Sequence, residues 1–342
     1  MVTTSTMWCG LDVAKATFVA AIDNHQEDFR ILPSRKFQRT QEGIAEMAQW
    51  IASKVPEALQ DGNSLGFVME STGKFSCEML PWIIEAFPGS SPAILNPRIT
   101  KAFIDSHGLG NRTDAMEARC LARMGTERKP KPTQVLPDEY QQLRELVRTR
   151  EALVCSRAAA KTRLQTMTRG SVVYKAEERV IAVYTQEIDK LEKGMKKLVA
   201  QHEELKTNVG IMSSFPGIAF LSACIILSEI GPIREDKSRN ELSAYTGLAP
   251  CRKESGTSVN KSRLSKHGSP LLRKVLYLCA IHSVKKVPTL TNKYERLVQR
   301  GKKPLTARCA CMRSMVLILR RMVLNGAKYD PQYEMKIKTP AA

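Results

Sequence analysis

The stretch Met7-Trp8-Cys9-Gly10-Leu11-Asp12-Val13 decides the fold of the N-terminal part of the chain. It is an apolar run with one acid near its end, which is typical of a buried β-strand. Residues 17–23 (TFVAAID) have the same character, and only a tight turn at residues 14–16 separates the two segments. We therefore expect two neighbouring strands, with Asp12 near the end of the first.

The following residues alternate between strand and helix patterns. Further strands are predicted around Phe29–Phe37, over Leu65–Met69 with Glu70 at its end, and over Pro92–Leu95, closed by Asn96-Pro97. Helices are predicted over residues 41–54 and 76–87, and another opens in the segment 111–119 with Thr113 as its N-cap. Strands followed by alternating strands and helices are typical of an α/β domain with a mixed sheet.

A proline-rich link (Pro130, Pro132 and Pro137) indicates a domain boundary, and residues 138–208 have long helical patterns. From Ile181 to Leu205 the core positions alternate by three and four, which is a heptad register, and Gly170-Ser171 interrupts the region. One interpretation is an antiparallel helical pair or a coiled coil that joins protomers. The other is an intramolecular hairpin packed on the domain, and periodicity alone does not separate them.

The C-terminal part has helical patterns over residues 219–230, 240–246, 270–284 and 305–323, and the tail after Gly326 is predicted to be loosely ordered. The turn Phe215-Pro216-Gly217-Ile218 allows two interpretations: a hairpin whose backbone amides meet phosphate, or a simple helix cap.

Residues 250–263 (PCRKESGTSVNKSR) are predicted to form a flexible loop that mixes hydroxyls with cations. The hydroxyls are those of Ser255, Thr257, Ser258 and Ser262, and the cations are Arg252, Lys253, Lys261 and Arg263. Such a loop suits nucleophilic attack on a phosphodiester, or phosphate binding without chemistry. Taken alone, the loop favours phosphate binding, because polar basic loops are common in proteins that bind nucleic acid.

The charge of the chain points to a polyanionic partner. The 342 residues carry a formal net charge of +19, with a pI near 9.6. Residues 251–342 hold 21 Lys and Arg against 4 Asp and Glu, whereas residues 1–100 hold 8 against 11. This distribution favours nucleic acid as the partner of the C-terminal part and allows a local group of acids in the N-terminal part.

Membrane and secretion signals are not expected from this sequence. No run of 18 or more apolar residues occurs, and the N-terminus lacks the pattern of a signal peptide. The nine cysteines form no CxxC pair, which is typical of reduced thiols in a cytoplasmic protein.

The acids of the predicted α/β domain form a candidate metal site. Asp12 and Glu70 lie at strand ends, and Asp114 and Glu117 are three residues apart on one helix face. Carboxylates gathered in this way repel one another, and a hard divalent cation such as Mg²⁺ compensates them. Two such ions can stabilise the attacking and leaving oxygens of phosphoryl transfer.

The order of these motifs resembles a known family. The segments are Gly10–Lys15, Met69–Gly73, Asn96-Pro97 and Arg112–Arg119, then Pro216–Ile218, Ala244–Pro250, Glu254–Gly256 and Leu264–Gly268. In this order, over roughly residues 7–325, they resemble the bridge-RNA-guided transposases of the "one-ten" family of insertion sequences, also called DEDD transposases. The fourth acid of that family is usually Asp, whereas this chain has Glu117.

The resemblance implies a fold of class α/β plus α. Residues 1–130 would form a ribonuclease-H-like domain similar to Holliday-junction resolvases, residues 138–208 a coiled-coil region, residues 211–326 a small helical transposase domain and residues 327–342 a tail. It implies that Asp12, Glu70, Asp114 and Glu117 hold Mg²⁺ and that Ser255 is the nucleophile that forms a phosphoserine link to DNA. Because these residues lie in different predicted domains, we expect a composite site.

The resemblance also implies partners. A structured guide RNA would pair with donor and target DNA, and the protein would act as a tetramer in the cytoplasm, associated with the nucleoid. Arg252, Lys253, Lys261, Arg263, Lys266 and Arg273 are the candidate nucleic-acid-binding residues. The alternatives are a metal-dependent Holliday-junction-type endonuclease without a covalent intermediate, and a nucleic-acid scaffold without enzymatic activity.

Overall fold

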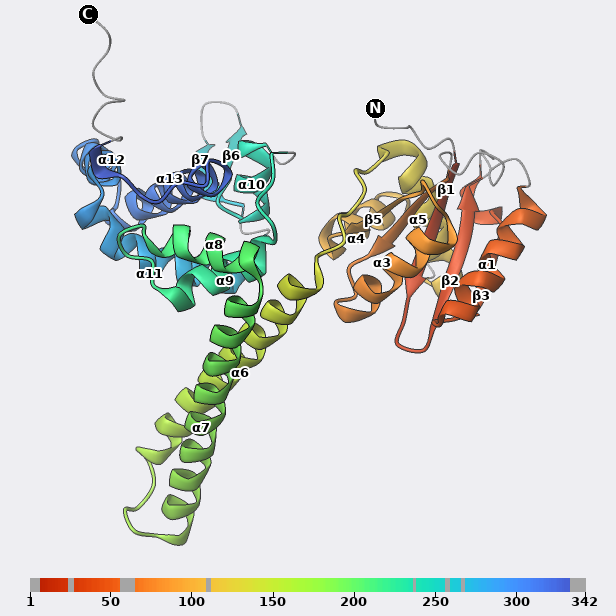
Figure 1. Cartoon of the computed structure of the whole chain (residues 1–342). Helices are drawn as coiled ribbons and strands as arrows, with labels where there is room; N and C mark the ends of the chain where they lie inside the picture. Colours follow the sequence, from red (N-terminus) through yellow and green to blue (C-terminus); the bar gives the residue numbers. More distant parts are fainter. Residues whose placement is uncertain are drawn as a thin grey trace, which may run out of the picture. The chain divides into compact units, whose positions relative to one another are not determined.

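The structure is a computed structural model, and it describes residues 7–23, 28–55, 65–108, 112–235, 238–255, 259–265 and 268–332. Side chains are described throughout these ranges except for residues 252–263. The chain divides into two compact units, Met1–Val135 and Leu136–Ala342, each with its own core (Figure 1).

Unit 1 is built on a five-stranded mixed sheet in the order β3-β2-β1-β4-β5. Its strands are β1 (Met7–Val13), β2 (Thr17–Asp23), β3 (Ser34–Gln38), β4 (Leu65–Glu70) and β5 (Ser91–Leu95). β1, β2 and β3 pair antiparallel, whereas β1, β4 and β5 pair parallel. The predicted α/β domain with a mixed sheet is confirmed. The third strand is shorter than predicted, because Phe29–Ile31 forms a 3₁₀ turn before it.

Helices cover both faces of this sheet. α1 (Gln41–Lys54) and α3 (Lys74–Ala86) pack on one face against the apolar side chains of Cys9, Leu11 and Val13 in β1. α5 (Asp114–Arg128) packs on the other face, where Leu121 contacts Trp8 and Val68. Because successive strand residues point to opposite faces, Trp8, Gly10 and Asp12 all belong to the α5 face.

Helix α4 (Pro97–Ser106) was not predicted, because Asn96-Pro97 was interpreted only as the end of strand β5. The Asn96 side chain accepts a hydrogen bond from the backbone N–H of Arg98 at 2.9 Å, and Pro97 occupies the first turn. Asn at the N-cap followed by Pro is a common start of a helix. The dipeptide therefore ends the strand and begins a helix at once.

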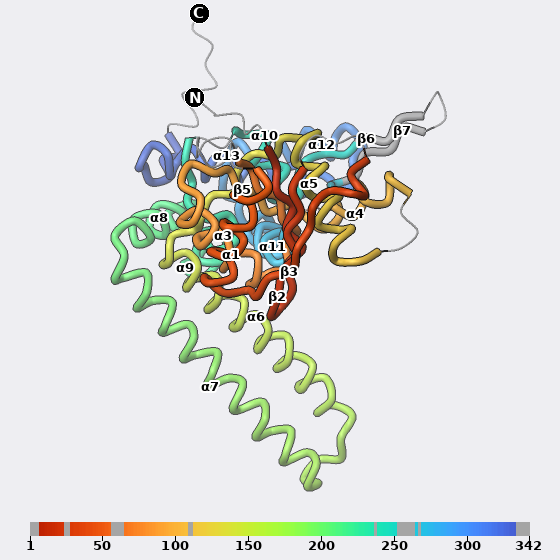
Figure 2. The backbone as a smooth tube through the Cα atoms, turned by 90° about the vertical axis from the view of Figure 1, so that its right-hand side faces the viewer, coloured from red at the N-terminus to blue at the C-terminus, as the bar shows by residue number. Residues whose placement is uncertain are grey.

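Unit 2 begins with a helical hairpin of α6 (Asp138–Leu164) and α7 (Val172–Gln201), interrupted at Gly170-Ser171 as predicted. Two ion pairs join the helices: Arg150 with Glu192 at 2.8 Å and Arg163 with Glu177 at 2.6 Å. The heptad residues Ile188 and Met195 are buried within this same chain. The hairpin is thus intramolecular, and it extends away from the other helices of unit 2 (Figure 2).

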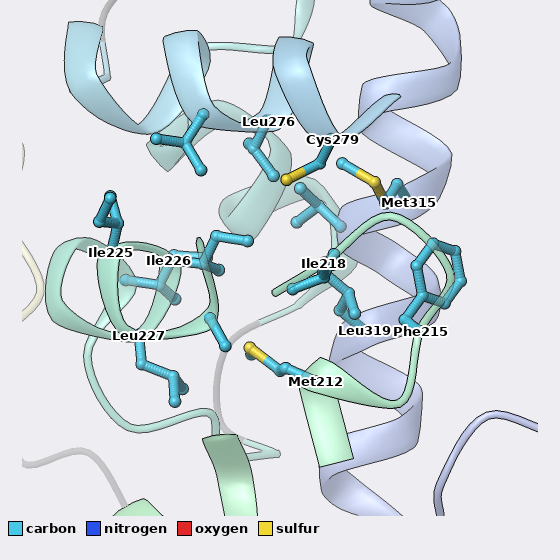
Figure 3. Packing of buried hydrophobic residues seen from close by; sticks show 14 of the residues in the cluster. Met212, Phe215, Ile218, Ile225, Ile226, Leu227, Leu276, Cys279, Met315 and Leu319 are labelled. Carbon is cyan, nitrogen blue, oxygen red and sulfur yellow. The ribbon is translucent and has the colours of Figure 1, made fainter. Parts of the chain in front are cut away.

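The rest of unit 2 is a helical body with one apolar core. Its helices are α8 (Glu203–Ser213), α9 (Phe220–Ile230), α10 (Arg239–Tyr245), α11 (Pro270–Lys286), α12 (Pro288–Gln299) and α13 (Pro304–Leu324). Figure 3 shows Phe215, Ile218, Ile226, Leu276 and Met315 meeting in this core. The Pro216 carbonyl accepts a hydrogen bond from Ser283 Oγ at 2.7 Å, so the Pro-Gly-Ile turn is packed against α11.

The prediction of a flexible loop over residues 250–263 is wrong, because this segment contains two β-strands. β6 (Pro250–Ser255) and β7 (Val259–Leu264) form an antiparallel hairpin in which Ser255 pairs with Val259. Ladder hydrogen bonds fix the backbone even where polar residues on both faces hide the alternation of a strand.

Among the described residues, none of the helices has the length and apolar character that crossing a membrane requires.

Candidate active site

The sheet places Asp12 and Glu70 on neighbouring strands and on the same face. β1 and β4 run parallel with Leu11 opposite Met69, so the next residue on each strand is an acid. Leu11 and Met69 both belong to the core on the α1 and α3 side, and the residues that follow them therefore point to the α5 side. The sheet brings these two acids together by strand register alone.

Helix α5 brings the other two acids to this face. The Thr113 side chain accepts a hydrogen bond from the backbone N–H of Met116 at 3.3 Å, which confirms the predicted N-cap. Asp114 and Glu117 both lie in the first turn of α5. Carboxylates at the start of a helix are stabilised by its dipole, which offsets part of their repulsion.

A glycine in β1 allows α5 to lie close to the sheet. A Cβ atom on Gly10 would stand 2.1 Å from the Ala118 carbonyl oxygen and 2.2 Å from the Ala122 nitrogen. Both are backbone atoms of α5, so no side chain fits between the helix and the strand at this point. Gly10 lies two residues before Asp12, and Ala118 follows Glu117 directly. The close contact therefore lies next to the acids.

The acids act on one another electrostatically. Burial, and then the charges of Glu117, Asp114 and Glu70 in that order, raise the pKa of the Asp12 carboxyl to about 6. Strand register and the start of α5 thus place the four predicted ligands on one side of the sheet, as one acidic group. Their role as ligands stays a prediction.

The acidic group fits a hard divalent cation in its chemistry. All four side chains offer carboxylate oxygens, which Mg²⁺ prefers, and a cation among them would remove the repulsion that acts on Asp12. Within the residues that the structure describes, no set of three or more His, Cys, Asp or Glu side chains converges closely enough to form a complete metal site. The carboxylates thus lie near one another without meeting at a single point.

Two contacts of α4 were missed because the helix itself was not predicted. The hydroxyl of Thr100, which is fully buried, donates a hydrogen bond to Glu70 Oε2. Asp105, near the end of α4, forms an ion pair with Arg112, two residues before Asp114. The sequence signal for these contacts is the Asn-Pro start of α4, which places Thr100 in its first turn.

Ser255 lies in unit 2 at the last position of β6, next to the turn of the hairpin. Arg252 and Lys253 are on the same strand, and Lys261 and Arg263 on its partner, so these candidate residues share one hairpin. Thr257, Ser258 and Lys266 lie outside the described residues.

The segments directly before and after this hairpin contact each other. A Cβ atom on Gly247, which has φ +70°, would stand 2.7 Å from the Gly268 nitrogen. The Arg273 guanidinium donates to the Gly268 carbonyl, and burial lowers its pKa. This contact gives Arg273 an intramolecular partner in addition to the nucleic-acid contact predicted for it.

Comparison with known proteins supports one family over both units. A family model described as a transposase, of the IS110 DEDD type, matches residues 9–172. A second, described as the transposase IS116/IS110/IS902 family, matches residues 210–295. The first match covers all four acids, and the second covers Ser255.

Two of the similar proteins match nearly the whole chain. The pilin gene-inverting protein of Moraxella lacunata is 26% identical over 328 residues, covering 95% of this chain and 98% of the relative. The pilin gene-inverting protein of Moraxella bovis is similar to the same extent. The transposase for insertion sequence element IS1111A of Coxiella burnetii is 23% identical over 60% of this chain and 63% of its own length.

Proposed function

The chain belongs to the IS110 family of transposases, and from this premise we propose that it is an RNA-guided DNA recombinase that cuts and rejoins DNA through a phosphoserine link at Ser255. The observation that supports the proposal is the placement of Asp12, Glu70, Asp114 and Glu117 on one side of the mixed sheet of unit 1, by strand register and by the start of α5. DNA-recombining activity follows from the family. To this activity we add three proposals: the guide RNA, Ser255 as the nucleophile and Mg²⁺ as the metal.

Asp12, Glu70, Asp114 and Glu117 would hold Mg²⁺, which supplies charge stabilisation for phosphoryl transfer when it is bound. The protein contributes the positions of these groups. Strand register sets Asp12 and Glu70, while the cap at Thr113 and the close contact at Gly10 set Asp114 and Glu117. Glu117 takes the place of the usual Asp, and its charge raises the pKa of Asp12 more than the charges of Asp114 and Glu70 do, which supports its membership of the group.

Ser255 would attack the phosphorus atom of a DNA phosphodiester. A bond forms between Ser255 Oγ and phosphorus, the bond from phosphorus to the 3′ oxygen breaks, and the serine proton ends on the 3′-hydroxyl that is released. The phosphoserine ester keeps the energy of the broken bond. A 3′-hydroxyl from another strand can then attack this ester, which reseals the DNA and restores the serine hydroxyl without ATP.

The partners would be a structured guide RNA with donor and target DNA. The 21 cations against 4 acids after residue 250 support a surface that binds phosphate. If base pairing with the guide reads the sequence, the protein needs mainly contacts to the nucleic-acid backbone. Arg252, Lys253, Lys261 and Arg263, on the Ser255 hairpin, would position the phosphate under attack.

A tetramer would bring the reacting DNA ends together. Val173, Ala176, Val180 and Val183 recur on α7 at intervals of three and four residues, and three of them are valines with 59%, 39% and 54% exposure. These residues lie outside the register that packs α7 on α6, which supports a second apolar contact between protomers.

The decisive experiment is a denaturing gel of the full chain with guide RNA, Mg²⁺ and end-labelled DNA. We expect a protein–DNA adduct with wild type and none with Ser255→Ala, while Ser262→Ala, on the neighbouring strand, keeps the adduct. Cleavage without any adduct in both wild type and Ser255→Ala would instead support a metal-dependent endonuclease of the Holliday-junction type. Unchanged activity of Asp12→Asn would support a role without metal chemistry.

A further inference from the structure

Helix α4 contacts the acidic group directly. β5 pairs with β4 so that Leu95 stands opposite Glu70, and the chain then enters α4 at Asn96-Pro97. The first turn of α4 therefore lies beside the end of β4, where Glu70 is located. Thr100 Oγ1, in this turn, donates its hydrogen bond to Glu70 Oε2.

We propose that Thr100 is a positioning residue of the acidic group: its hydroxyl fixes the Glu70 carboxylate in the orientation that binds a divalent cation. The proposal rests on the metal site of the proposed function and adds to it a residue that does not itself hold the ion.

Because Thr100 is buried, its hydroxyl donates to Glu70 and not to water. The side chain is 0% exposed, so water does not compete for the hydroxyl. The hydroxyl has a second acceptor in reach, the Pro97 carbonyl at 3.1 Å, but it has only one proton. An ionised carboxylate is the stronger acceptor, and the proton therefore goes to Glu70. A buried threonine on a helix would otherwise donate to its own backbone.

The contact leaves one Glu70 oxygen for a cation. Oε2 accepts from Thr100, and the second oxygen of the same carboxylate keeps its lone pairs free of that bond. Carboxylates that bind metals are commonly oriented by such an outer hydrogen bond, and its loss typically weakens metal affinity about 10–100-fold. Holding the side chain in one rotamer also removes the entropy that Glu70 would lose on binding.

The test measures binding of Mn²⁺, as a probe for Mg²⁺, by electron paramagnetic resonance of the full chain without nucleic acid. Thr100→Val keeps the shape of the side chain and removes the hydroxyl, so we expect Mn²⁺ affinity to fall about 10–100-fold. Thr100→Ser, which keeps the hydroxyl, should bind Mn²⁺ nearly as well as wild type. Thr126→Val is the matched control, because the Thr126 hydroxyl on α5 donates to the Ala122 carbonyl of its own helix.

The variant Asp12→Asn distinguishes an error in the role of Thr100 from an error in the proposed metal site. Wild-type affinity in Thr100→Val, together with loss of binding in Asp12→Asn, would overturn the role of Thr100 and leave the metal site intact. Wild-type affinity in both would overturn the metal site and the Thr100 role together. If Thr100→Val reduces the folded fraction seen by circular dichroism, Thr100→Ala, with room for a water, is measured instead.

A second readout excludes a merely structural effect. With guide RNA and labelled DNA, cleavage by Thr100→Val should recover as the Mn²⁺ concentration is raised, because the defect lies in affinity for the ion. A defect that Mn²⁺ does not rescue would count against positioning and in favour of damage to the fold.

Discussion

Among the three carboxylates that raise the pKa of Asp12, Glu117 has the largest effect, ahead of Asp114 and Glu70. The acid for which the resemblance implies Asp in place of Glu is therefore the one of the three that acts most strongly on Asp12 in β1. Helix α5 lies close to β1 where Ala118 and Ala122 face Gly10, and Glu117 directly precedes Ala118.

Glu117 should be required as a carboxylate. We expect Glu117→Gln to lower the rate of DNA cleavage at least about 10-fold at limiting Mg²⁺, because it removes one charged ligand. Glu117→Asp keeps the charge and should retain most of the rate. The measurement is the rate of adduct formation against Mg²⁺ concentration. Wild-type dependence on Mg²⁺ in Glu117→Gln would remove this residue from the site.

Asp12 should make the stability of the metal-free protein depend on pH. Its pKa is about 6 in the folded protein against an ordinary 3.8, so the folded state binds this proton more tightly than the unfolded state does. The stabilisation from the proton is complete below the ordinary pKa and is lost as the pH rises through about 6. In EDTA, Asp12→Asn should therefore be more stable than wild type at pH 7.5, with a smaller difference at pH 4.5.

Urea unfolding at the two pH values measures this difference. Asp189→Asn, an exposed acid on α7, controls for the general effect of removing a charge. A difference between Asp12→Asn and wild type that does not change with pH would contradict the raised pKa.

Gly10→Ala should disturb the acidic group through α5. The new methyl would overlap backbone atoms of α5, and overpacking of this kind typically costs about 1–3 kcal/mol. We expect a lower free energy of unfolding and weaker Mn²⁺ binding. Gly194→Ala is the control: on α7 the new Cβ meets only Leu146 Cδ2 at 3.6 Å, and alanine favours the helix. Equal stability of the two variants would argue against the close contact.

Arg273 should act inside the protein. We expect Arg273→Ala to reduce adduct formation, because the Gly268 carbonyl at the base of the Ser255 hairpin loses its donor. The dependence of nucleic-acid affinity on salt should stay as in wild type. Arg300→Ala, an exposed cation after α12, is the comparison. If Arg273→Ala reduces the salt slope by about one, as the loss of a phosphate contact does, Arg273 binds nucleic acid instead.

The outer valines of α7 should join protomers. We expect Val180→Asp combined with Val183→Asp to lower the molar mass measured by light scattering, with little change in melting temperature, because both side chains are exposed in the single chain. Val298→Asp on α12, where the valine is 38% exposed, is the matched control. An unchanged mass in the double variant would place the contact between protomers elsewhere.

Much of unit 1 followed from the sequence because its signals are local. The strands around Asp12 and Glu70 are continuous apolar runs, and Thr113 is a cap with an ordinary pattern after it. The sequence also predicts that Asp12 and Glu117 share one site, but it does not predict the close contact of α5 with Gly10. A glycine in a strand indicates that something approaches closely, but the sequence does not say which element.

The errors have similar physical causes. The segment around Ser255 was interpreted as a loop because it is polar on both strands, and only the ladder of backbone hydrogen bonds shows its structure. Helix α12 was missed because its pattern is mostly polar and starts at Pro288. Helix α4 is hidden in the sequence because one dipeptide, Asn96-Pro97, both ends strand β5 and begins the helix.

The alternation of β1 also restricts how this protein can evolve. Cys9, Leu11 and Val13 belong to one core, whereas Trp8, Gly10 and Asp12 belong to the opposite face. Deleting or inserting one residue ahead of Asp12 within the strand would exchange the two faces, placing a carboxylate in an apolar core. Related genes should therefore keep the length of this strand, so alignment gaps should fall in the connections between strands.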